Sequence, residues 1–319
     1  MTPLDPAIQS RLETLKAKYA TSGQELLDFL DGLLEADYLT YWDYIRLDTL
    51  LSLQQPRTQH HDEPIFIMYH QITELYFKLV LHELNAAVAA PMPGTAEWTP
   101  VHSAALTEHV RRCTRYFEAL ENSFAVMTDG LNREQFLRFR MALIPASGFQ
   151  SSQYRMIELA LARLNDLVHA DLRSEFAQEN DLSKLLENIY WRRGATLVET
   201  GEKALTLKQF EAKYDTMFAD RAQKLRGLTL SDRAKILAQN NELGDDLRLA
   251  LRELDHQVNV RWPMQHLKTA GRYLAKQPSD LRATGGTNWP KYLPPKLVAH
   301  CFSLSLVLRR TRAMGPLSA

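Results

Sequence analysis

The sequence predicts an all-α protein of one helical domain over residues 1–319. Glycine is scarce, at 13 of 319 residues, and alternating β-branched runs are almost absent. Long amphipathic segments rich in Leu, Ala, Glu, Arg and Lys dominate the chain instead. Apolar residues make up 45% of the chain and charged residues 24%, which is an ordinary globular composition with material for a sizeable core.

Composition also excludes several classes of function. Lysine plus arginine equals aspartate plus glutamate, at 38 each, so no basic excess points to nucleic acid as a partner. Two cysteines, Cys113 and Cys301, are too few and too far apart for a disulfide framework or a thiolate zinc site. Because no apolar run reaches about 18 residues and residues 1–10 do not resemble a signal peptide, we expect a cytoplasmic protein without a membrane segment.

The first third of the chain predicts short helices around an aromatic stretch. An amphipathic helix is expected over Pro6–Leu34, with a hinge at Thr21–Gly23, and a short one over Leu47–Leu53. Between them lie four closely spaced aromatic residues, Tyr38, Tyr41, Trp42 and Tyr44. Exposed aromatic side chains with polar tips are typical of interfaces and ligand rims, although an ordinary packing corner would have the same pattern.

The strongest helix signal lies over His61–Leu84. Pro64 suits a first helical turn, and the preceding acidic residues Asp62 and Glu63 suit a helix N-terminus. One face of this helix is apolar except for His70 and a threonine. A histidine in such a stripe is either a core imidazole satisfied by its neighbours or a hydrogen-bond partner aimed into a ligand cavity.

The central part of the chain carries an arginine beside aromatic residues. After a helix over His102–Thr128, which should bury Cys113, Asn132 is expected to cap a helix that carries Phe136 and Arg140 on one face. Arg140 is either a solvated or cation–π residue, or a planar, bidentate clamp for a carboxylate.

The second half of the chain continues as helices separated by polar loops. A helix capped near Ser151 should continue to about Val168, and a long helical stretch should cover Gly244–Gln277. Within that stretch His266 lies one turn after Trp262, and Pro263 should kink or restart the helix between them. His266 alone is again either structural or a ligand.

The last part of the chain holds a loop and one further helix. The hydroxyl-rich loop Arg282–Asn288 could close over a ligand, and Val298–Leu308 should form a final apolar helix. The chain has no H-E-x-x-H, no G-x-S-x-G, no dinucleotide-binding fingerprint and no internal repeat. A zinc hydrolase, a serine hydrolase or a dinucleotide-dependent enzyme is therefore excluded.

Several motifs, in one order, resemble those of the tryptophan 2,3-dioxygenase family of haem-dependent aromatic oxygenases. The motifs are Tyr41-x-x-Tyr44-x-x-Leu-Asp48, His61-Asp-Glu-x-x-Phe66-Ile-x-x-His70-Gln-x-x-Glu74-Leu, Phe139-Arg140, Pro145-Ala-Ser-Gly-Phe-Gln-Ser-x-Gln-Tyr-Arg155, Trp262-x-x-x-His266 and Thr284-Gly-Gly286. They span roughly residues 38 to 290. The resemblance implies a haem-binding helical bundle and a cofactor of haem b, which is iron protoporphyrin IX.

The resemblance also implies roles for single residues. His266 would be the proximal ligand of the haem iron, and His70 and Phe66 would lie on the distal side with the substrate indole. Arg140 would bind the substrate carboxylate, and Thr284 its carboxylate or ammonium end. Other expected contacts to the substrate come from three aromatic side chains, Phe136, Tyr41 and Tyr44. In the family the two tyrosines line a neighbouring subunit's pocket, so residues 1–50 should contact that subunit in a homotetramer.

The implied reaction uses O₂ and the indole ring of L-tryptophan or a substituted, for example β-methyl, tryptophan. Dioxygenation at C2–C3 would give an N-formylkynurenine-type product; His70 would orient the indole or act as a base. Where the family usually has Gly-Thr-Gly-Gly-Ser-Ser-Gly, this chain has Ala283–Trp289, and Pro263 is also unusual. These departures leave two alternatives: monooxygenation to a 3-hydroxy-oxindole in natural-product biosynthesis, and, from another class, a non-catalytic haem-binding protein.

Overall fold

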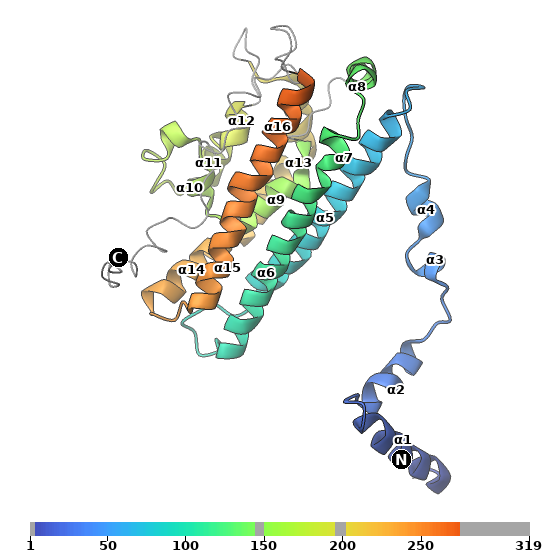
Figure 1. Cartoon of the computed structure of the whole chain (residues 1–319). Coiled ribbons are helices and arrows are strands. Elements are labelled where there is room, and N and C mark those ends of the chain that lie inside the picture. Colours follow the sequence, from blue (N-terminus) through green and yellow to red (C-terminus); the bar gives the residue numbers. More distant parts are fainter. Residues whose placement is uncertain (1–3, 144–149, 195–201, 275–319) are drawn as a thin grey trace, which may run out of the picture. The chain divides into compact units, whose positions relative to one another are not determined.

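Helices make up the architecture of the chain. The computed structural model describes residues 4–143, 150–194 and 202–274, and the chain divides into two compact units, Met1–Gln55 and Pro56–Ala319 (Figure 1). Within these described ranges no strand occurs, and a single isolated bridge joins Val168 to Ile189. This confirms the all-α prediction. No helix in the same ranges is long and apolar enough to cross a membrane.

The first unit contains four helices: α1 (Pro6–Ala20), α2 (Leu26–Glu35), α3 (Tyr41–Tyr44) and α4 (Leu47–Leu51). The expected hinge is confirmed, because α1 ends before Gly23, whose φ of +69° suits a residue without a Cβ. None of residues 4–55 is buried. Its large exposed side chains include Leu27, Leu33, Leu34, Tyr38, Tyr41, Trp42 and Tyr44. This unit therefore has no hydrophobic core of its own.

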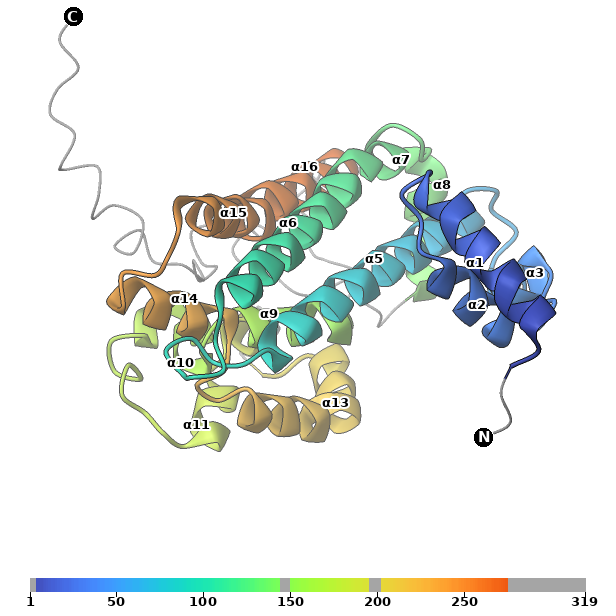
Figure 2. The ribbon, with the colours of Figure 1, turned by 90° about the horizontal axis from the view of Figure 1, so that it is seen from below.

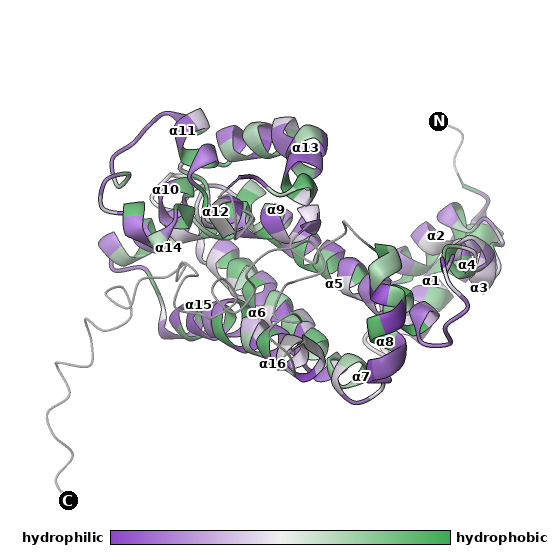
Figure 3. Cartoon of the chain, turned by 90° about the horizontal axis from the view of Figure 1, so that it is seen from above, coloured by the Kyte–Doolittle hydropathy of each residue, from purple (hydrophilic) through white to green (hydrophobic). Residues whose placement is uncertain are grey.

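The second unit is built on long helices that run side by side (Figures 1 and 2). Helix α5 (Glu63–Ala89) packs against α6 (Pro100–Ser123) and α9 (Ser152–Leu161), and α15 (Asp245–His256) packs against α6. Hydrophilic and hydrophobic residues alternate along α5 and α6, as expected of helices that bury one face (Figure 3). The core between the helices is apolar and aromatic.

Two acidic residues fix the start of α5. The Glu63 carboxylate is buried and accepts hydrogen bonds from the backbone N–H groups of Arg57 and Thr58, both at 2.8 Å, and from the Thr58 hydroxyl at 2.5 Å. Asp62 Oδ2 accepts the backbone N–H of Asn132 at 2.6 Å, although its side chain does not cap α5 itself. Glu63 thus joins the preceding loop to the start of α5, and Asp62 joins the backbone at Asn132 to it.

Shorter elements complete the second unit. They are α7 (Ala125–Thr128), α8 (Arg133–Phe139), η1 (Arg140–Leu143), α10 (Leu164–Leu167), η3 (Ala170–Leu172), α11 (Leu182–Glu187), α12 (Tyr190–Gly194), α13 (Leu205–Lys224) and α14 (Leu230–Gln239). As predicted, Asn132 caps α8: its side-chain oxygen accepts the N–H groups of Glu134 and Gln135. Cys113 is buried, also as predicted.

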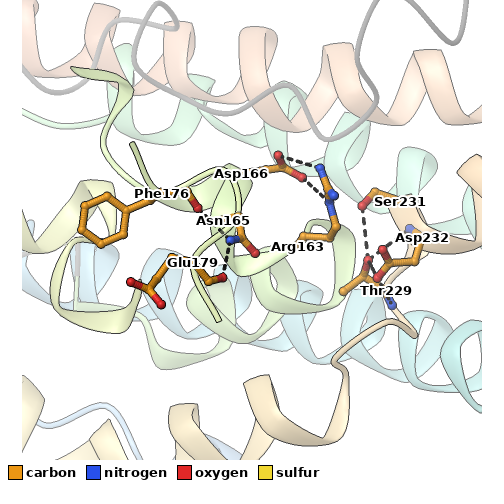
Figure 4. A network of polar contacts seen from close by, with 8 residues as sticks. All are labelled: Arg163, Asn165, Asp166, Phe176, Glu179, Thr229, Ser231 and Asp232. Carbon is orange, nitrogen blue, oxygen red and sulfur yellow. Dashed lines mark hydrogen bonds and ion pairs between the residues drawn. The ribbon is translucent and has the colours of Figure 1, made fainter. Parts of the chain in front are cut away.

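The helix predicted from Ser151 to Val168 is wrong in its second half. Helix α9 ends at Leu161, Ala162 is extended, and α10 begins separately at Leu164. Side-chain contacts in the next turn stabilise the break (Figure 4). Arg163 pairs with Asp166 through two contacts of 2.9 and 3.1 Å, and Asn165 Nδ2 donates to the backbone oxygens of Phe176 and Glu179. The Asn165 hydrogen bonds satisfy two backbone carbonyls of the following loop. These carbonyls would lack this partner if α9 continued as one helix.

Pro263 is accommodated by a π-helical turn. Residues Gln257–Arg261 form this turn, in which the Trp262 N–H donates to the Gln257 carbonyl, and α16 (Trp262–Leu274) follows directly. In a regular helix Pro263 would clash with the carbonyl four residues earlier and remove its hydrogen bond. The wider turn lets the chain accommodate the proline. The predicted restart before His266 is therefore confirmed.

Candidate active site

A backbone hydrogen bond fixes the tautomer of His70. His70 lies on α5, and its Nδ1 donates to the Phe66 carbonyl oxygen at 2.7 Å. Since a carbonyl only accepts, the proton of the neutral ring is on Nδ1, and Nε2 has a free lone pair. Burial lowers the pKa of His70 below its ordinary value, against smaller opposing effects of that carbonyl and of Glu74. The ring is therefore a neutral acceptor at pH 7.

Aromatic rings pack around Phe66, which lies against His70. The ring of Phe66 lies 4.1 Å from that of His70, 5.9 Å from Phe136 and 5.7 Å from Phe139. Phe136 also lies 5.2 Å from Tyr273 of α16. Together α5, α8 and α16 thus provide an aromatic wall that suits a flat, apolar ring as ligand.

His266 lies on α16 among other aromatic side chains. Its ring is 5.3 Å from Phe124 and 5.6 Å from Trp262, and it makes no hydrogen bond to the part of the chain that the structure describes. Burial, together with a smaller electrostatic effect of His70, lowers the pKa of His266 to about 4. A neutral imidazole without a competing partner has the chemistry of a metal ligand.

A chain of rings connects the two histidines. Tyr69 lies 5.8 Å from His70 and 5.8 Å from Phe124, and Phe124 lies against His266. The histidines, almost 200 positions apart in the chain, therefore belong to one aromatic region built by α5, the junction of α6 and α7, and α16. Tyr69 and Phe124 were not among the predicted site residues. Their signals were weak: Tyr69 adjoins His70, and Phe124 continues the helical spacing of buried Phe117 and Leu120.

Arg140 lies directly after α8, at the start of η1. It follows Phe139, whose ring contacts Phe66, and its backbone N–H caps α8 by donating to the Phe136 carbonyl. Its side chain is half-buried. Its neighbour Phe139 belongs to the aromatic wall, and a planar guanidinium has the chemistry of a carboxylate clamp.

The other predicted site residues lie in the first unit or outside the described residues. Tyr41 and Tyr44 lie in the first unit and are 71% and 76% exposed. Thr284, the loop Arg282–Asn288, the helix expected over Val298–Leu308 and part of the Pro145–Arg155 motif lie outside the described residues. Within the described ranges no three His, Cys, Asp or Glu side chains form a metal-binding group.

Comparison with known proteins identifies the family. A family model described as tryptophan 2,3-dioxygenase matches residues 32–241. A tryptophan 2,3-dioxygenase of Ruegeria sp. (strain TM1040) is 31% identical over 291 residues, covering 86% of this chain and 93% of the relative. One from Bradyrhizobium diazoefficiens is 39% identical over 149 residues, covering 47% and 49%, respectively. The chain belongs to the tryptophan 2,3-dioxygenase family.

Membership of the tryptophan 2,3-dioxygenase family makes the protein an enzyme of the oxidoreductase class. The alternative of a non-catalytic helical protein is thereby set aside. The matched region includes His70 on α5 and Arg140 after α8, and it ends before His266. The chemistry of His266 therefore rests on its own surroundings in α16.

Proposed function

We propose that the protein is a haem-dependent dioxygenase that opens the indole ring of L-tryptophan or a substituted, for example β-methyl, tryptophan. The observation that carries the proposal is the pair of neutral imidazoles, His70 and His266, which share one aromatic region. One has a free acceptor nitrogen and the other has no hydrogen bond within the described residues. The names of the relatives support the same substrate class.

The residues around His266 fit haem b. A neutral imidazole among Phe124 and Trp262 offers one axial nitrogen in an apolar environment, which is the usual setting for a haem ligand. When bound, haem supplies the iron at which O₂ becomes reactive toward indole. His266 would hold the iron, and the aromatic side chains of α6 and α16 would exclude water.

The remaining site residues would bind and orient the amino acid. His70 Nε2 would accept the indole N–H, and Phe66 and Phe136 would contact the indole ring. Arg140 would hold the carboxylate through a bidentate pair, and Thr284 would bind its carboxylate or ammonium end. Orientation of a flat ring by one acceptor and one cation would fix which carbons face O₂.

The first unit would complete the pocket of a neighbouring copy. Residues 4–55 bury no side chain, and they expose the apolar face of α2 together with Tyr41 and Tyr44. An apolar surface of this kind is characteristic of subunit interfaces. We propose a homotetramer in which the two tyrosines of one subunit contact the substrate bound to the next.

The test is the mass of the product. Reduced, haem-loaded protein is supplied with ¹⁸O₂ and L-tryptophan, and with β-methyltryptophan in parallel. Gain of two labelled oxygen atoms is expected, and the faster substrate identifies the preferred side chain. Gain of one labelled oxygen would replace ring opening by monooxygenation. If a haem-loaded sample gave no oxidised product from either amino acid, the proposed function would be overturned.

A further inference from the structure

The Glu121 carboxylate binds amides on both sides of Pro263. Gln257 Nε2 donates to Glu121 Oε2 at 2.7 Å, and Gln265 Nε2 donates to Glu121 Oε1 at 3.2 Å. Gln257 is the first residue of the π turn, whereas Gln265 immediately precedes His266. We call these three side chains the Glu121 bridge. It connects α6 to the chain before and after the proline.

The Gln257 arm of the bridge is itself fixed in place. Its side chain is 1% exposed, and its amide nitrogen also approaches the Phe117 carbonyl of α6 at 3.4 Å. Its amide oxygen accepts from Arg261 Nη1 at 3.3 Å. A buried amide whose donor and acceptor are both used has little freedom to turn. Glu121 is therefore bound by the rigid side chain of Gln257 and by the side chain of Gln265, which is adjacent to His266.

The backbone in this region needs such an anchor. Pro263 has no N–H to donate, and the π turn before it lacks the regular hydrogen-bond ladder. The rings of Phe124 and Trp262 contact His266, but flat rings slide more easily than hydrogen bonds stretch. A rotation of α16 about its axis would turn the imidazole of His266 away from its present direction.

We propose that Glu121 is a positioning residue that sets the rotation of α16 and thereby aims the His266 imidazole. Glu121 does not touch the ring; it acts through Gln265 on one side of Pro263 and through Gln257 on the other. The inference rests on the proposed function, in which His266 binds haem iron. It predicts that loss of the bridge weakens or misdirects the iron–histidine bond while leaving the helical bundle folded.

The test compares Glu121→Ala and Gln265→Ala with Glu118→Ala, all in haem-loaded protein. Glu118 is an exposed carboxylate one turn earlier on α6, so its variant controls for the loss of a charge and a side chain from that helix. The readouts are the iron–histidine stretching band of the ferrous protein and the rate of haem transfer to apomyoglobin. Far-UV circular dichroism checks that each variant is folded.

We expect both bridge variants to shift or broaden the band and to release haem about tenfold faster than wild type, in the range known for groups that orient metal ligands. Glu118→Ala should match wild type. Glu121→Gln should largely restore both readouts, because Gln265 can turn its amide to keep a hydrogen bond. Gln265→Ala removes one half-buried arm only, so it tests the bridge even if Glu121→Ala does not fold.

The outcomes separate this inference from the proposed function. Wild-type protein without an iron–histidine band, or a His266→Ala variant that retains the band, would overturn haem ligation by His266. If the band depends on His266 but neither folded bridge variant changes the band or the rate of haem release, the Glu121 bridge has no positioning role.

Discussion

At the scale of single residues, one hydrogen bond determines the chemistry of His70. The Phe66 carbonyl accepts a hydrogen bond from Nδ1–H, which leaves Nε2 as the proposed acceptor for the indole N–H. We expect His70→Ala to lower kcat/KM for tryptophan by about tenfold, the worth of one neutral hydrogen bond of about 1.4 kcal/mol. Steady-state kinetics measure it, with exposed His82→Ala of α5 as the control. An unchanged kcat/KM in His70→Ala would contradict the acceptor role.

Removal of the Arg140 charge should impair the reaction of tryptophan more than removal of the His70 hydrogen bond. Loss of a partner from a buried, charge-assisted pair costs about 2–5 kcal/mol, so Arg140→Ala should raise the KM for tryptophan by at least about 30-fold. Arg140→Lys should restore little, because an ammonium cannot form the bidentate fork. Arg138→Ala, at an exposed arginine of the preceding helix α8, is the kinetic control. Equal KM values for Arg140→Ala and wild type would exclude the carboxylate clamp.

Glu63 makes the stability of the fold depend on pH. Burial alone would raise the pKa of this carboxyl, but hydrogen bonds from Thr58 and Arg57 outweigh it and hold the pKa below its ordinary 4.5. Its contribution is therefore present above pH 4.5 and lost as pH falls through the lower folded-state pKa. Glu63→Gln should reduce the free energy of unfolding by about 1–3 kcal/mol at pH 7.

The Glu63 prediction is checked by urea unfolding at several pH values. The difference between wild type and Glu63→Gln should shrink steadily below pH 4.5 because the carboxyl of the folded wild type then becomes protonated. Glu118→Gln, at an exposed site, should show no such change. A Glu63→Gln difference that stayed constant down to pH 3 would show that the carboxylate charge is not what stabilises this loop.

At the scale of elements, the end of α9 depends on the side chain of Asn165. Its amide holds the Phe176 and Glu179 carbonyls at 2.8 and 2.9 Å, so Asn165→Ala leaves two backbone acceptors of the following loop without this partner (Figure 4). We expect a loss of about 1–3 kcal/mol in the free energy of unfolding. Urea unfolding measures it, and Asn122→Ala, exposed on α6, should stay within about 0.5 kcal/mol of wild type. Equal losses in the two variants would contradict a specific role for Asn165.

Helix existence was predictable for the long elements, whereas some helix ends were not. The apolar spacing of α5 and the cap at Asn132 are local signals, and both were confirmed. The break after Leu161 depends on partners ten or more residues further along the chain, which no local pattern contains. Pro263 gave a reliable signal for a restart, but its π-helical form depends on packing against α6.

At the scale of the whole molecule, a shared pocket predicts complementation between defective subunits. Arg140→Ala and Tyr44→Ala should each be impaired alone. In a mixed oligomer, some neighbouring subunits would be one of each variant. One of the two sites that such a pair shares would combine an intact Arg140 with an intact Tyr44. Refolding an equal mixture should therefore restore about a quarter of wild-type activity. The readout is activity after mixing, with separately refolded variants pooled afterwards as the control. No gain over that control would exclude a pocket shared between subunits.

The candidate site was predictable residue by residue but not as an arrangement. Spacing and the family motifs predicted His70, Arg140 and His266 as site residues, and the described structure places the two histidines among aromatic rings on α5 and α16. Tyr69 and Phe124 connect His70 to His266, and this connection follows from tertiary packing alone. The Glu121 bridge was likewise hidden, because Glu121 lies more than 130 positions before either glutamine.

The π turn before Pro263 has a consequence for how this sequence can change length. Each residue removed from a helix rotates everything after it by about 100° and shortens it by about 1.5 Å. Deleting one residue from Gln257–Arg261 would restore a regular turn, yet it would bring Pro263 into conflict with the preceding carbonyl and direct His266 to a different face. A shorter version would have to replace the proline and move the histidine at the same time. We therefore expect deletions here to be tolerated only in combination.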